Sequence, residues 1–111
     1  MSILAFPQRA PLQVGFDRVE LNRILDLYGR MVAAGHWRDY SVNFDRDAAV
    51  FAAFRRATER PEVRIEKRPA LRNRQGQWAM IGEAGATLKR GHHLSLVLAP
   101  IERRLMKLVA E

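Results

Sequence analysis

Arginine is the residue type whose spacing in this chain most clearly suggests chemistry. Between residues 55 and 74 there are eight basic and three acidic side chains, so this stretch carries +5 of the net charge of +7. A guanidinium group binds phosphate or carboxylate through two parallel hydrogen bonds. The candidate residues for binding an anion or a nucleic acid are Arg55, Arg56, Arg64, Lys67, Arg68, Arg72 and Arg74. The alternative is a solvated basic face that binds nothing.

The histidines and glycines point to no catalytic or metal chemistry. His92 and His93 are adjacent, whereas two metal ligands on a helix normally stand four residues apart. The glycines at 82 and 85 lack the Gly-Lys-Ser/Thr ending of a phosphate-binding loop and are typical of a hairpin. No cysteine is present, and no serine lies in a nucleophile motif. We therefore expect no catalytic residue, metal or cofactor and a protein that is not an enzyme, and the sequence identifies no small-molecule ligand.

The first element that would position these side chains is a helix that begins near Asp17. Asp17 and Glu20 have the spacing of a capping box, and Phe16 and Leu21 have that of a hydrophobic staple. Apolar residues then recur at three- and four-residue steps up to residue 32. Gly35 is suited to end the helix in a left-handed conformation.

A change to two-residue periodicity predicts strands after this helix. Residues 40–44 and 49–55 alternate around a turn, and the second of these strands carries apolar residues on both faces. Residues 63–67, 77–81 and 86–90 give three more strands. Apolar residues then recur at three- and four-residue steps to the end of the chain, which predicts a helix. Pro100 is expected to kink or break that helix. The sequence predicts an α+β fold with a five-stranded antiparallel meander between two helices.

The expected organisation is one domain over residues 16–111, preceded by a tail over residues 1–15. The terminal helix has a broader apolar surface than one sheet face needs. We expect the excess apolar surface of this helix to be buried either by tail residues Ile3, Leu4 and Phe6 or by an identical helix in a homodimer. The candidate self-association residues are Leu96, Val97 and Leu105.

Charge and composition limit the possible partners. The 111 residues have a pI near 11 and are 48% hydrophobic, which is typical of a small basic globular protein. We expect no signal peptide, no membrane association and a cytoplasmic location. The predicted function is a binding module for another protein or for itself, with DNA or RNA binding through the arginines as the alternative.

Three stretches resemble a family of small alphaproteobacterial proteins known as a domain of unknown function. These are Phe16–Phe44 (FDRVELNRILDLYGRMVAAGHWRDYSVNF), Arg64–Pro69 (RIEKRP) and Leu88–Leu94 (LKRGHHL). The resemblance covers about Phe16 to Leu98 and implies a bacterial, cytosolic protein. It assigns no catalytic or binding residue.

Overall fold

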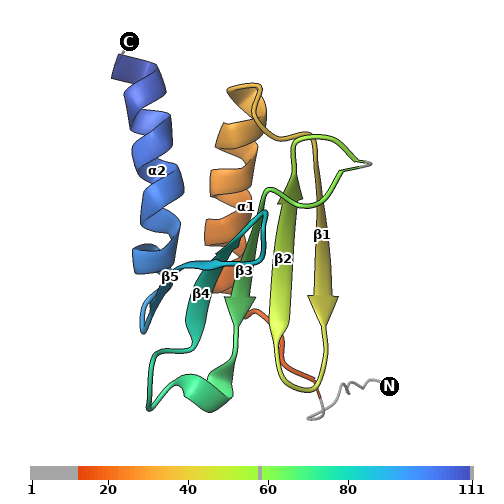
Figure 1. The fold of residues 1–111 in the computed structure, drawn as a ribbon, viewed down its shortest axis with the longest axis vertical. Coiled ribbons are helices and arrows are strands. Elements are labelled where there is room, and N and C mark those ends of the chain that lie inside the picture. The colour runs from red at the N-terminus through yellow and green to blue at the C-terminus, as the bar shows by residue number, and fades with distance from the viewer. Residues whose placement is uncertain (1–12, 58, 111) are drawn as a thin grey trace.

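The structure, a computed structural model, describes residues 13–57 and 59–110 (Figure 1). Ile3, Leu4, Phe6 and most of the expected tail lie outside these residues. The elements are α1 (Arg18–Ala33), β1 (Asp39–Phe44), β2 (Ala49–Phe54), β3 (Val63–Lys67), the short 3-10 helix η1 (Pro69–Leu71), β4 (Trp78–Gly82), β5 (Thr87–Gly91) and α2 (Leu94–Ala110). The predicted α+β fold is confirmed.

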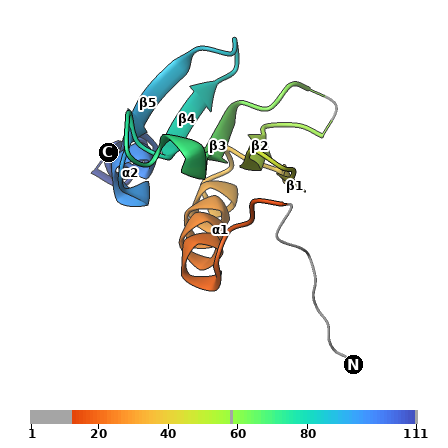
Figure 2. The ribbon, with the colours of Figure 1, turned by 90° about the horizontal axis from the view of Figure 1, so that it is seen from below.

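The five strands form one antiparallel meander in the order β1-β2-β3-β4-β5. Both helices cover the same face of this sheet (Figure 2). We call the other face the open face. Directly paired residues share a face, so one row of the open face contains Ser41, Ala52, Arg64, Ile81 and Thr87. Val50 and Phe54 of β2 are half-buried on this face. This agrees with the apolar residues that the sequence places on both faces of this strand.

The core lies between the sheet and the two helices. Phe51 is fully buried, and both tryptophans, Trp37 and Trp78, are at most 3% exposed. The ring of Phe16, just before α1, stacks on the ring of Trp78 with centroids 6.1 Å apart. The same ring contacts the ring of Phe44 edge-on, with centroids 6.0 Å apart. Both tryptophans therefore belong to the core.

Both ends of α1 form as the sequence predicted. The Asp17 carboxylate accepts the backbone N–H of Glu20, and the Glu20 carboxylate accepts the backbone N–H of Asp17. At the other end Gly35 has a φ of 84°, which only glycine adopts without strain. The N–H groups of Gly35 and His36 bond to the carbonyls of Val32 and Met31, which is a Schellman ending.

Helix α2 corrects the predicted self-association surface. Val97 is fully buried and Leu105 is 8% exposed, so both belong to the chain's own core. Of the three predicted residues, Leu96 is the one on the outer side, 41% exposed. The helix is not broken at Pro100. Proline removes the hydrogen bond to the carbonyl four residues earlier, and because this is Leu96 on the outer side, water can replace it.

We expect the substitution Asp17→Ala to lower the free energy of unfolding by about 1 kcal/mol, because it removes the side-chain acceptor of the capping box. The melting temperature should fall by several degrees in a thermal unfolding experiment. Asp17→Ser, which keeps an oxygen acceptor, is the control and should lose less. Equal melting temperatures for Asp17→Ala and the parent protein would show that the cap contributes nothing to stability.

Candidate functional site

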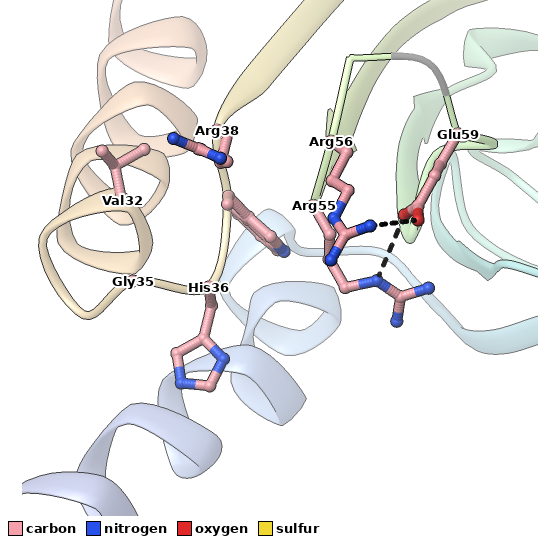
Figure 3. A pocket seen from close by; sticks show the side chains of 8 residues that line it. Val32, Gly35, His36, Arg38, Arg55, Arg56 and Glu59 are labelled. Carbon is pink, nitrogen blue, oxygen red and sulfur yellow. Dashed lines mark ion pairs between the residues drawn. The ribbon is translucent and has the colours of Figure 1, made fainter.

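A basic cleft lies between the turn that follows α1 and the chain that follows β2 (Figure 3). Its volume is about 790 Å³. The lining residues are Val32, Gly35, His36, Trp37, Arg38, Arg55, Arg56 and Glu59. The lining therefore carries three arginines and one carboxylate. The guanidinium groups of these three arginines could bind an anion.

The first wall of the cleft is set by the end of α1. The left-handed Gly35 turns the chain so that Trp37 enters the core, where its ring stacks on Tyr28 with centroids 6.0 Å apart. The next residue, Arg38, donates its backbone N–H to the carbonyl of Phe54 at 2.8 Å. This bond joins the start of β1 to the end of β2 and leaves the Arg38 side chain exposed at the cleft.

The second wall is held by ion pairs. Arg55 donates to Glu83 at 2.9 Å and lies 3.7 Å from Glu59, while Arg56 lies 3.9 Å from Glu59 (Figure 3). The hydrogen bond and the charge of Glu83 raise the pKa of Arg55 above its ordinary value. Arg38 is exposed and has no ion pair within residues 13–57 and 59–110, so its charge is open to an added anion.

A polar junction lies behind the first wall and ties it to α2. The indole Nε1 of Trp37 donates to Oε1 of Glu62 at 2.8 Å. Arg104 of α2 donates to Oε2 of the same carboxylate at 2.6 Å. Its other terminal nitrogen lies 3.2 Å from Nδ1 of His36, whose ring points toward α2 (Figure 3). Because a guanidinium only donates, Nδ1 of His36 is the acceptor in this contact.

The ionised form of Glu62 is stabilised by this junction. Burial by itself would raise the pKa of Glu62, but the hydrogen bonds from Arg104 and Trp37 and the charges of Arg104 and Arg55 outweigh burial. The pKa of Glu62 is therefore below its ordinary value of 4.5. A fixed negative charge at this point holds Trp37 and Arg104 in place beneath the cleft.

The seven predicted anion-binding residues do not form one patch. Arg55 and Arg56 line the cleft, and Arg64 lies in the middle of the open face. Lys67 lies on the helix-covered face, where its ammonium donates to Glu20 at 2.7 Å and to the carbonyl of Gly15 at 3.0 Å. Strand alternation explains this separation, because Lys67 and Arg64 differ by an odd number of residues.

The remaining candidates lie at the end of β3 away from the cleft. Arg68 pairs with Glu66 at 3.2 Å, whereas Arg72 and Arg74 are exposed after η1. Arg64, Arg72 and Arg74 have no ion pair in the described part of the chain. The basic stretch is therefore divided among the cleft, the open face and the η1 end of the sheet.

Sequence reasoning missed Arg38 and Arg104 as members of the site. His36 lies in the turn between α1 and β1 and also beside α2, a contact that no local pattern indicates. Glu62 and Arg104 are 42 residues apart, and no spacing rule links them. A signal for Arg38 was its position directly after Gly35, His36 and Trp37, where the chain leaves the helix.

The described residues also limit other kinds of site. None of the helices in residues 13–57 and 59–110 is long and apolar enough to span a bilayer. The same residues contain no group of three or more histidine, aspartate or glutamate side chains placed to hold a metal ion.

Comparison with known proteins gives one match. A family model described as "Protein of unknown function (DUF2794)" matches residues 14–98. Searches of curated proteins and of solved structures found no match.

The lowered pKa of Glu62 predicts how stability depends on pH. The unfolded chain binds a proton at Glu62 near pH 4.5, and the folded protein binds it only at lower pH. The stability that this carboxylate contributes is therefore complete above that value and is lost as the pH falls through the folded pKa. We expect Glu62→Gln to unfold more easily at neutral pH, by about 1–3 kcal/mol, because Arg104 loses its partner.

Chemical denaturation from neutral pH to below pH 4.5 measures this effect. The free energy of unfolding should fall less steeply with acid for Glu62→Gln than for the parent protein. Glu66→Gln, which also removes one negative charge, controls for net charge. Parallel curves for Glu62→Gln and the parent protein would contradict the assignment.

Proposed function

Because the chain belongs to DUF2794, a family of proteins of unknown function, we propose its function from the cleft itself. The protein is a non-enzymatic binding module that holds an acidic segment of another protein between Arg38 and Arg56. A bacterial, cytoplasmic setting is part of this proposal, and it is supported by the resemblance to small alphaproteobacterial proteins and by the absence of cysteine.

The observation that carries the proposal is the surplus of positive charge in the cleft. Glu59 lies against Arg55 and Arg56, and Arg55 is also occupied by Glu83. Arg56 stays 74% exposed, and Arg38 has no acidic partner in the residues described. Two guanidinium groups on opposite walls can therefore bind carboxylates. Val32, 40% exposed at the rim, adds an apolar contact of the kind that a peptide side chain fills.

The aromatic residues favour a protein over a single-stranded nucleic acid. Binding of unpaired bases uses exposed aromatic rings as stacking platforms. Of the two aromatic rings that line the cleft, Trp37 is 2% exposed with its indole N–H bound to Glu62, and the ring of His36 points toward α2, where it contacts Arg104. The cleft therefore offers charge and an apolar rim but no surface for stacking a base.

Nucleic-acid binding is the second candidate, and it rests on Arg64, Arg72 and Arg74. These arginines lie away from the cleft, and the described residues hold no ion pair for any of them. Phosphate contact of this kind needs no base recognition and weakens steeply with salt.

Fluorescence anisotropy with two probes separates the two candidates. The probes are labelled poly-L-glutamate and a labelled DNA duplex, at matched ionic strength. We expect Arg38→Glu to weaken poly-L-glutamate binding at least about tenfold, because an ion pair becomes a repulsion. Arg23→Glu, an exposed change on α1 outside the cleft, alters the net charge equally and is the matched control.

Equal weakening by Arg38→Glu and Arg23→Glu would show that only net charge attracts the probe and would contradict the cleft. Tighter binding of the duplex, lost on Arg72→Glu and kept in Arg38→Glu, would establish the nucleic-acid candidate instead. Circular dichroism of every variant confirms that each one is folded.

A further inference from the structure

The sheet has two edges, and they differ in how they are protected. Strand β5 pairs with β4 through a register shift between Met80 and Ile81 and carries Lys89 and Arg90. A bulge and inward or flanking charges are the usual devices that prevent another strand from adding to an edge. The β5 edge is therefore protected against strand addition.

Strand β1, at the opposite edge, has almost none of these devices. It pairs with β2 in an unbroken register over residues 39–44, with one irregularity at its start, where the N–H of Arg38 also donates to Phe54, and residues 40–44 contain no charge and no proline. Tyr40 and Phe44 are 43% and 44% exposed on the helix side of this strand. An unprotected edge with exposed aromatic side chains is a template for another strand.

The hydrogen bonds show which backbone groups of β1 face outward. Asp45, just beyond the strand, donates its N–H inward to Ala48 at 3.0 Å. Alternation then directs the N–H and carbonyl groups of Tyr40, Val42 and Phe44 away from β2. The N–H of Tyr40 donates to the carboxylate of its neighbour Asp39 at 2.8 Å. Among the described residues, the Asp39 carboxylate occupies one outward donor of β1, and the N–H of Val14 donates to the carbonyl of Asp45 at 2.7 Å just beyond the strand.

We propose that β1 pairs antiparallel with β1 of a second copy of this chain, about a twofold axis through Ser41. In this register Tyr40 lies opposite Val42 of the second copy, an aromatic and β-branched pair that stabilises sheets. Asp39 lies opposite Asn43 of the second copy. Its carboxylate can accept the Asn43 amide, which frees the Tyr40 N–H to donate to the Val42 carbonyl of the second copy.

The charges at the ends of β1 select this register and a second copy as the occupant. A twofold axis through Val42 would place Asp39 opposite Asp45 and Arg38 opposite Arg46, and like charges directly opposite are destabilising. The axis through Ser41 avoids both pairs. It places Arg38, exposed and without an ion pair in the described chain, opposite Phe44 and next to Asp45 of the second copy. The strand is therefore complementary to itself.

The dimer would place its two basic clefts at opposite ends of the joined strands, because Arg38 begins β1 and the strands run antiparallel. Because Arg38 would then lie next to Asp45 of the second copy, a partner with two acidic segments would bind the two clefts mainly through Arg56, and the second contact would form at a high effective concentration. The pairing itself rests on the β1 edge and holds whether or not the cleft binds an acidic protein.

Analytical ultracentrifugation of the full chain from micromolar to submillimolar concentration tests the pairing. We expect a reversible dimer, because an interface of one strand pair is small. Ser41→Lys should give a monomer at every concentration, since two ammonium groups would meet at the axis while the exposed position leaves the monomer intact. Thr87→Lys, exposed in the same row at the protected edge, is the matched control and should still dimerise.

A mixture of Ser41→Lys and Ser41→Glu should form a heterodimer, because opposite charges then meet at the axis. A parent protein that stays monomeric throughout would overturn the proposal. So would a dimer that persists in Ser41→Lys, because its interface would lie elsewhere. Circular dichroism of each variant distinguishes a lost interface from a lost fold.

Discussion

The carboxylate of Glu62 joins three parts of the chain that are far apart in sequence. It accepts hydrogen bonds from the Trp37 indole after α1 and from Arg104 of α2, and Glu62 itself directly precedes β3. Taking a carboxylate partly out of water is costly unless its oxygens are bonded, and here each oxygen has a donor within 2.8 Å. Removal of either donor leaves a poorly solvated charge, so the helices and the sheet are fixed relative to one another at this point.

The position of the cleft follows from this junction. Trp37 is held in the core, so the next residue, Arg38, must emerge at the surface, where its N–H binds the end of β2. The junction also uses Arg104, and other ion pairs use Arg55, Lys67 and Arg68, so much of the positive charge stabilises the fold. The places of the remaining cations in the fold, rather than the net charge alone, decide what they can bind.

The sequence predicted those features that depend on neighbouring residues. The Asp17 and Glu20 cap, the left-handed Gly35 and the two-residue alternation of β1 to β3 each follow from a local rule, and each is present. The failures concern contacts between distant residues. Lys67 forms an ion pair with Glu20, which is 47 residues away in the sequence. In α2, Val97 faces the core and Leu96 faces outward, although both residues are apolar. The width of the apolar surface of a helix does not indicate which of its apolar residues face the sheet.

Hydrogen exchange at the indole N–H of Trp37, followed by NMR, tests most directly whether the Glu62 junction holds the molecule together. The two tryptophans give separate indole signals, and that of Trp37 is the one bound to a carboxylate within the junction. The account predicts slow exchange for Trp37 in the parent protein and much faster exchange in Arg104→Met, while the backbone amides of the central strands stay protected. Exchange of the Trp37 indole at the rate of a free indole in the folded parent protein would contradict it.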